Sequence, residues 1–212
     1  MKVKICGLTN IEDASFAVEL GVDALGFIFA SSPRQILPEK AKEIIHALPP
    51  FIKTVGVFVN EEPSSISKTV QFCGLDLVQL HGDESPDFCG RFMPRAIKAF
   101  RLKDESSLHP VASYCEKVRA FLFDAYSKDK RGGTGKTFDW DLAVRGKEPG
   151  IPVILSGGLA PSNIEEAVSH VGPYAVDVNS GVEERPGIKS RSLMEDLMNT
   201  IRKMERRGIV DD

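Results

Sequence analysis

The 212-residue sequence has few cysteines, and they lack the spacing of a metal or redox site. Its four cysteines, Cys6, Cys73, Cys89 and Cys115, form no C-x-x-C pair, and no closely spaced histidine pair accompanies them. This excludes the common zinc and thioredoxin-like motifs and indicates a reducing, cytoplasmic setting. We expect the last three, which lie near predicted helix ends, to be small buried hydrophobic residues. Cys6 differs because it closes the first predicted strand.

Long apolar runs and a strong charge of either sign are also missing. Runs such as Ala24–Ala30 are far shorter than the roughly 18 residues that a membrane helix needs. Met1 leads directly into a strand-like segment and not into a signal peptide. A formal net charge of -3, with 42% hydrophobic and 27% charged residues, is typical of ordinary globular proteins. We therefore expect neither a membrane anchor nor a nucleic-acid partner.

Two nucleotide-binding motifs are absent as well. No G-x-G-x-x-G turn follows the first predicted strand, which disfavours a dinucleotide-binding fold. The segment 131–137 ends in Gly-Lys-Thr like a P-loop, but the first glycine of that motif would fall on Lys130. A long loop of this composition is typical of a mobile lid over a phosphorylated ligand, with Gly133 and Gly135 as phosphate contacts. A plain surface loop is the alternative interpretation.

The sequence does contain a regular alternation of strand-like and helical segments. Strand candidates recur at intervals of roughly 20 to 30 residues, the length of one βα unit. They cover 3–6, 24–30, 54–59, 75–80, 96–100, 120–123, 153–155 and 175–178. Segments with helical periodicity lie between or after them, over 11–20, 39–48, 64–72, 107–115, 163–170 and 193–204.

Strands that are apolar on both faces indicate a parallel sheet covered by helices. Eight such units in 212 residues favour an α/β fold of the (β/α)₈ TIM-barrel type as a single domain. We assign residues 1–205 to the barrel and residues 206–212 to a charged C-terminal tail. The charged end from Arg202 onward is interpreted as the fraying end of the last helix.

Small residues after the last two predicted strands indicate a phosphate site. In a TIM barrel the strand ends form the active site, and the loops after strands seven and eight often hold a phosphate. We expect backbone N–H groups and small side chains there to bind the phosphate of a small-molecule phosphosugar. The residues concerned are Gly157, Gly158, Asn179, Ser180 and Gly181. Tight turns alone are the alternative use of these glycines.

Seven segments at the predicted strand ends resemble, in order, the phosphoribosylanthranilate isomerase family. They are 4–9, 32–34, 79–82, 124–125, 132–140, 156–159 and 177–183. The resemblance implies a single barrel that catalyses the Amadori rearrangement of N-(5-phosphoribosyl)anthranilate in tryptophan biosynthesis. It also implies that the reaction uses neither a cofactor nor a metal. We expect a monomer or a homodimer.

The resemblance assigns the two chemical roles to Cys6 and Asp124. It implies that Asp124 is the general acid that protonates the ring oxygen, and that Cys6, as thiolate, removes the C2 proton. Such a pair needs opposite protonation states, so we expect a raised pKa for the carboxyl and a lowered pKa for the thiol. Lys4 is close in sequence, but we expect it to point to the other face of the strand. Without the resemblance, Cys6 reads as a barrel-filling thiol and Asp124 as a strand-end cap.

The resemblance also points to substrate-binding residues. Arg34 resembles the partner of the anthranilate carboxylate, a task that suits its planar fork, with a surface salt bridge as the alternative. His81 and Asp177 close strands at the same mouth, so we expect them to be substrate ligands or structural hydrogen-bonding groups.

Two other classes of protein are alternatives. Another phosphosugar barrel is one. A ribulose-phosphate epimerase needs metal-binding histidines, of which only His81 is at hand, and an indole-glycerol-phosphate synthase needs lysine–carboxylate pairs, which an outward-facing Lys4 cannot supply. The second alternative is a non-catalytic phosphate-binding module, against which the presence of Cys6 and Asp124 argues.

Overall fold

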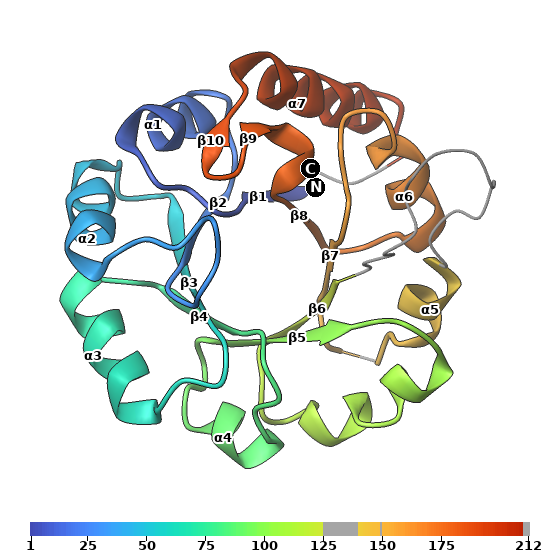
Figure 1. Ribbon diagram of the computed structural model, residues 1–212. Coiled ribbons are helices and arrows are strands. Elements are labelled where there is room, and N and C mark those ends of the chain that lie inside the picture. The colour runs from blue at the N-terminus through green and yellow to red at the C-terminus, as the bar shows by residue number, and fades with distance from the viewer. Residues whose placement is uncertain (125–139, 149, 210–212) are drawn as a thin grey trace.

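Eight parallel strands close into a barrel in the computed structural model, which describes residues 1–124, 140–148 and 150–209 (Figure 1). The strands are β1 (Lys2–Ile5), β2 (Ala24–Ile28), β3 (Lys53–Phe58), β4 (Leu77–Leu80), β5 (Ala96–Arg101), β6 (Ala120–Asp124), β7 (Val153–Ser156) and β8 (Ala175–Val178). Each strand pairs with the next, and β8 returns to β1 in a register that sets Lys4 opposite Asp177. The predicted TIM barrel and all eight predicted strands are confirmed.

Helices surround the barrel. They are α1 (Ile11–Glu19), α2 (Pro38–Ala47), α3 (Pro63–Cys73), α4 (Pro86–Gly90), α5 (Trp140–Arg145), α6 (Ile164–Val171) and α7 (Arg191–Arg206). The 3₁₀ turns are η1 (Glu105–Leu108), η2 (Val111–Tyr114) and η3 (Ser180–Val182), and a hairpin is formed by β9 (Glu183–Arg185) and β10 (Ile188–Lys189).

Two predicted helical segments differ from the structure. The helix expected over 107–115 is replaced by η1 and η2, which meet at Pro110, a residue without the N–H that a continuous helix requires. The last helix does not fray from Arg202 but continues to Arg206, because Ile201 and Met204 are buried against the barrel. The boundary between a barrel at 1–205 and a tail at 206–212 stays a prediction, and residues 210–212 lie outside the described part.

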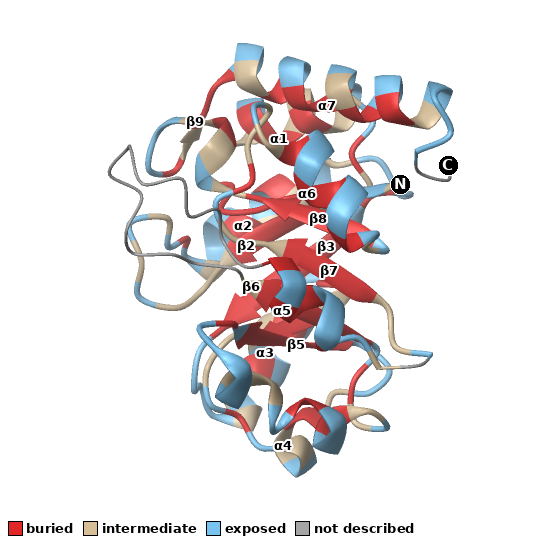
Figure 2. Cartoon of the chain, turned by 90° about the vertical axis from the view of Figure 1, so that its right-hand side faces the viewer, coloured by how far each residue is buried: buried red, intermediate tan, exposed pale blue. Residues whose placement is uncertain are grey.

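Apolar side chains form two layers around the strands. One fills the space between barrel and helices and includes Phe27, Phe121 and Phe123. The other fills the lower barrel interior and includes Val55 and Leu122. Figure 2 shows buried residues along the strands and on the inner faces of the helices, with exposed residues on the outer faces. This packing holds the strand ends rigidly, so it fixes the positions of the side chains at the barrel mouth.

Candidate active site

The inward-facing strand positions change from apolar to polar toward the carboxyl ends of the strands. On β6 the inward positions are Ala120, Leu122 and Asp124, since alternate residues share a face. On β1 the same rule places Lys4 and Cys6, two residues apart, on one face. The prediction that Lys4 points away from Cys6 is therefore wrong.

The polar positions line a cavity of about 260 Å³ at this end of the barrel. Its lining includes the predicted site residues Cys6, Arg34, His81, Asp124, Asp177, Gly157, Gly158, Asn179 and Ser180. Cys6 and Asp124 thus face one shared space, as the two-group chemistry requires. Gly133 and Gly135, and with them the predicted lid, lie outside the described residues.

Cys6 is buried, and its side chain occupies space that Gly26 of the neighbouring strand β2 leaves free. Its Sγ and the Lys4 side chain face Gly26 of β2, where an added Cβ would lie only 2.6 Å from Cys6 Sγ and 3.0 Å from Lys4 Cε. The absence of a side chain at Gly26 therefore makes room for both groups.

The charges around Cys6 act on the thiol in opposite directions. Burial raises the pKa of Cys6, and the Asp177 carboxylate adds to this, whereas the ammonium groups of Lys4 and Lys189 lower it. The net pKa is raised, so the expectation of a lowered thiol pKa is wrong. Burial alone would lower the pKa of Lys4, but Asp177 and Cys6 together raise it, so Lys4 stays a cation.

Lys4 also forms a buried ion pair that the sequence did not predict. Its Nζ lies 2.9 Å from Asp177 Oδ1, and both side chains are about 5% exposed. A lysine–carboxylate pair is therefore present, and the argument that an outward Lys4 excludes an indole-glycerol-phosphate synthase fails.

Asp124 ends a hydrogen-bonded chain that starts at this pair. Lys4 Nζ donates to Gln79 Oε1 at 3.0 Å, Gln79 Nε2 lies 3.0 Å from His81 Nδ1, and His81 Nε2 lies 3.2 Å from Asp124 Oδ2. Both His81 and Asp177 thus have protein partners while lining the cavity. Gln79 lies in the matching segment 79–82, but its partners depend on the strand register, which the sequence alone does not specify.

The loops after β7 and β8, where the sequence predicts a phosphate site, lie against each other at the barrel mouth. Gly157 and Gly158 have positive φ values of 96° and 64°, which favour glycine. Within the described residues, their N–H groups and that of Ser180 donate to no protein acceptor. A Cβ on Gly181 would lie 1.8 Å from the Leu159 carbonyl oxygen, so a glycine is required for the two loops to touch.

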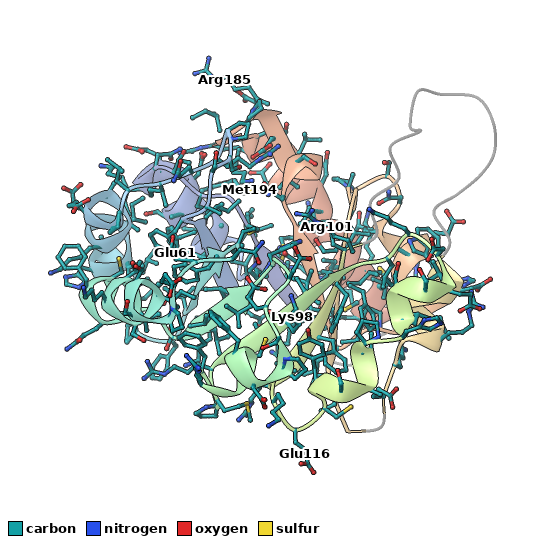
Figure 3. All side chains as sticks on the ribbon, turned by 60° about the horizontal axis from the view of Figure 1, so that its bottom comes forward. Glu61, Lys98, Arg101, Glu116, Arg185 and Met194 are labelled. Atoms are coloured by element: carbon teal, nitrogen blue, oxygen red, sulfur yellow. The ribbon has the colours of Figure 1, made fainter. Side chains whose placement is uncertain are left out.

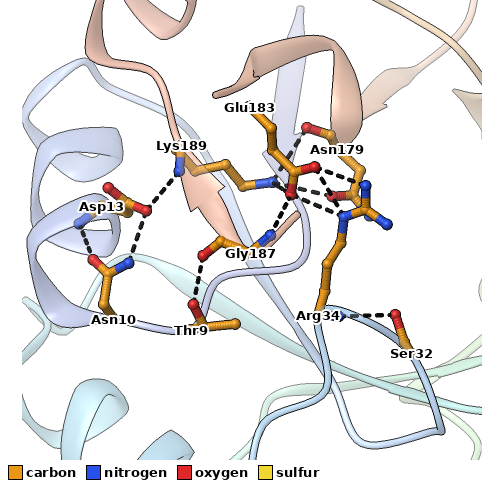
Figure 4. Close-up of polar contacts among 9 residues, drawn as sticks. All are labelled: Thr9, Asn10, Asp13, Ser32, Arg34, Asn179, Glu183, Gly187 and Lys189. Atoms are coloured by element: carbon orange, nitrogen blue, oxygen red, sulfur yellow. Dashed lines mark hydrogen bonds and ion pairs between the residues drawn. The ribbon is translucent and has the colours of Figure 1, made fainter. Parts of the chain in front are cut away.

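Arg34 is held by a carboxylate from the β9–β10 hairpin (Figure 4). Its Nε and Nη2 donate to Glu183 at 2.7–3.0 Å, and Lys189 Nζ donates to Glu183 Oε1 at 3.0 Å and to Asn179 Oδ1 at 3.0 Å. Burial alone would raise the pKa of Glu183, but Arg34 and Lys189 lower it below its usual value. The hairpin, whose Arg185 points outward in Figure 3, thus fixes the guanidinium at the edge of the cavity.

A second buried ion pair supports the loop that carries His81. Lys98 Nζ on β5 (Figure 3) lies 2.9 Å from Glu84 Oε2 and also donates to the Gly82 carbonyl. Glu84 in turn accepts from the backbone N–H groups of Asn60 and Gly82. These bonds tie the loops after β3 and β4 together, so the backbone that carries His81 is held in place.

Neither a metal-binding cluster nor a membrane-spanning helix is found in the described part of the chain. No group of three or more His, Cys, Asp or Glu side chains there is arranged to hold a metal ion. None of the helices that the structure describes combines the length and the apolar character that crossing a membrane requires.

Comparisons with known proteins agree on one family. Residues 3–200 match the family model described as N-(5'phosphoribosyl)anthranilate (PRA) isomerase. The N-(5'-phosphoribosyl)anthranilate isomerase of Geobacter sulfurreducens is 55% identical over 199 residues, which cover 93% of this chain and 97% of the relative. The crystal structure of phosphoribosyl anthranilate isomerase from Thermotoga maritima is 42% identical, with a TM-score of 0.87 over 96% of this chain and 99% of that one. A structure of such an isomerase with reduced 1-(o-carboxyphenylamino)-1-deoxyribulose 5-phosphate is 40% identical, with a TM-score of 0.85 over 96% and 99%.

Proposed function

Because this chain belongs to the N-(5'-phosphoribosyl)anthranilate isomerase family, we propose that Cys6 and Asp124 carry out the family's reaction in the shared cavity. The reaction is an intramolecular aldose–ketose isomerisation in tryptophan biosynthesis, and the chain is an enzyme of this kind. The observation that supports the residue assignment is that both groups face one space between rigid strand ends.

Asp124 is the general acid in this proposal. Its carboxyl group gives a proton to the furanose ring oxygen, the bond from that oxygen to C1 breaks, and the anthranilate nitrogen forms a protonated Schiff base with C1. Asp124 closes β6 at the cavity, with one oxygen bonded to His81. A fixed carboxyl near the reacting oxygen is the geometry that general acid catalysis needs.

Cys6 is the general base. Its thiolate removes the proton on C2, the electron pair moves to form the C1–C2 double bond, and the resulting enolamine tautomerises to the ketone. The raised pKa of Cys6 makes its thiolate a stronger base, although a smaller share is ionised near neutral pH. Lys4 limits that loss because its ammonium group stabilises the thiolate.

The remaining predicted residues bind the two anionic ends of the substrate. The N–H groups of Gly157, Gly158 and Ser180, which have no protein acceptor among the described residues, suit the phosphate together with Asn179, and Gly181 lets their loops touch. At the other end Arg34, which Glu183 engages through Nε and Nη2, presents Nη1 to the anthranilate carboxylate. His81 and Asp177 line the wall between these ends and contact the ribose in this proposal.

Turnover of fluorescent phosphoribosylanthranilate tests the assignment. We expect kcat to fall at least several hundredfold in both Cys6→Ala and Asp124→Asn, within the range of acid–base groups. Cys115→Ala removes a thiol outside the cavity and should keep the wild-type rate. An inactive wild-type protein would contradict the function, and full activity in both site variants would contradict the roles of Cys6 and Asp124.

The setting and assembly of the enzyme follow from chemistry and from its relatives. We infer that it works in the cytoplasm, where free cysteines such as Cys6 stay reduced. We further propose that it is a monomer or a homodimer, since a solved relative from Thermotoga maritima is described as dimeric and was also obtained as monomers. Sedimentation velocity of the purified protein distinguishes the two states.

A further inference from the structure

Gln79 is a buried polar residue that the mechanism above does not use. It lies on β4 with 1% of its surface exposed, between Lys4 and His81. A buried amide costs free energy unless its polar atoms are bonded, so its contacts specify its orientation. That orientation determines the arrangement of protons up to Asp124.

The direction of each hydrogen bond follows from the donors available. The Lys4 ammonium can only donate, so the Gln79 atom 3.0 Å from it is the carbonyl oxygen. The amide nitrogen of Gln79 then faces His81 Nδ1 and donates to it. A neutral imidazole that accepts at Nδ1 carries its proton on Nε2, which points at Asp124 Oδ2. A flipped amide would set two donors against each other at Lys4.

We propose that Gln79 is a positioning residue that holds His81 in the Nε2–H tautomer and thereby selects the oxygen of Asp124 that delivers the proton. Since Nε2–H donates to Oδ2, that oxygen serves as the acceptor, and the transferable proton sits on Oδ1. This inference rests on the proposed role of Asp124 as the acid. Lys4 consequently influences both proposed catalytic groups. Its ammonium group acts directly on the Cys6 thiolate, and it acts on Asp124 through the hydrogen bonds of Gln79 and His81.

The tautomer of His81 is measured directly in the free protein. Uniform ¹⁵N-histidine labelling gives signals from four histidines, and those of His81 are identified by their loss in His81→Gln. Long-range ¹H–¹⁵N correlation spectra should show the Nε2–H form in the wild type. Observation of the Nδ1–H form, or of a rapid mixture of both forms, would overturn the proposal whatever the activity of the enzyme.

Substitutions of Gln79 test the consequence for catalysis. In Gln79→Glu the carboxylate still accepts from Lys4 but can only accept from Nδ1, so His81 should switch to the Nδ1–H tautomer. Asp124 would then donate to His81 instead of to the substrate, and kcat should fall about 10- to 100-fold, while KM stays within about threefold. Gln79→Met removes both bonds and should give a mixture of tautomers with a smaller loss.

The controls separate this proposal from a structural role and from the proposed function. Gln71→Met makes the same replacement on the exposed face of α3 and should leave kcat and the spectra unchanged. An unaltered His81 tautomer in Gln79→Glu, or an unchanged kcat alongside a switched tautomer, would refute the positioning role. An inactive wild type with the Nε2–H form would instead contradict the function and leave the hydrogen-bond assignment standing.

Discussion

At the scale of single residues, the charges around the Cys6 thiol predict the pH dependence of the proposed reaction. Burial raises the pKa of Cys6, and the Lys4 ammonium works against that rise. Because the proposed reaction needs the Cys6 thiolate, kcat/KM should increase as pH rises toward and through this raised pKa. Removing the ammonium group should move the increase to still higher pH.

Lys4→Met makes this prediction measurable. It removes the cation and leaves the Asp177 carboxylate unpaired, and both changes raise the pKa of Cys6 further. We expect the thiolate fraction near neutral pH to fall about tenfold or more, since one pKa unit is a factor of ten. Ultraviolet thiolate absorbance, taken as the difference from Cys6→Ser, reports it. Lys53→Met removes a lysine that is mostly exposed and should not shift the titration, and an unshifted titration in Lys4→Met would contradict the argument.

The residues at the strand ends were predictable, but their partners were not. Cys6, His81, Asp124 and Asp177 follow from finding where each strand ends. The pairing of Lys4 with Asp177 needs the barrel to close, because 173 positions separate the two side chains. The shared face of Lys4 and Cys6, in contrast, follows from the two-residue period of a strand alone.

At the scale of elements, the contact between the loops after β7 and β8 shapes the proposed phosphate site. Gly181→Ala would place a methyl group 1.8 Å from a backbone oxygen, which only a shift of one loop can relieve. We expect KM to rise at least about tenfold and the free energy of unfolding to fall by about 1–3 kcal/mol, as for overpacking. Steady-state kinetics and urea unfolding measure the two effects.

Gly90→Ala is the matched control for this substitution. Gly90 is a helical residue of α4, and among the described residues the added methyl group would meet only Lys117 Cδ, at 3.3 Å, on a side chain that can shift. Alanine favours the helix there, so stability should be unchanged or slightly higher. Equal KM values for the two alanine variants would contradict the role of the loop contact.

Long elements with a strong pattern were easier to predict than short charged ones. The apolar strands and helices such as α3 follow from periodicity, whereas α4 has five residues and gives too little pattern to detect. The β9–β10 hairpin escaped detection because its strands are charged and very short. The hairpin contributes polar contacts and not apolar packing, because it places Glu183 and Lys189 beside Arg34.

At the scale of the whole molecule, stability depends on the apolar layer in the lower barrel. Leu122 is fully buried there among inward side chains from the surrounding strands. Leu122→Ala should lower the free energy of unfolding by about 2–5 kcal/mol, because close-packed neighbours cannot fill the cavity. Leu37→Ala deletes the same atoms from a side chain that is 69% exposed and should cost far less. Urea unfolding compares the two, and similar losses would contradict the importance of this layer.

The bonded chain from Asp177 through Lys4, Gln79 and His81 to Asp124 extends across the barrel from β8 and β1 to β4 and β6. Apolar side chains fill the barrel beneath it, and the ligand cavity lies above it. This row of hydrogen bonds is therefore the boundary between a polar and an apolar medium. Above it the cavity wall carries polar and charged groups that suit a phosphosugar, and below it the barrel interior is packed with apolar side chains. A substrate bound at that boundary would meet dipoles that are already oriented, whereas water would have to reorient as charge develops. The closed barrel would thereby lower the reorganisation cost of the reaction.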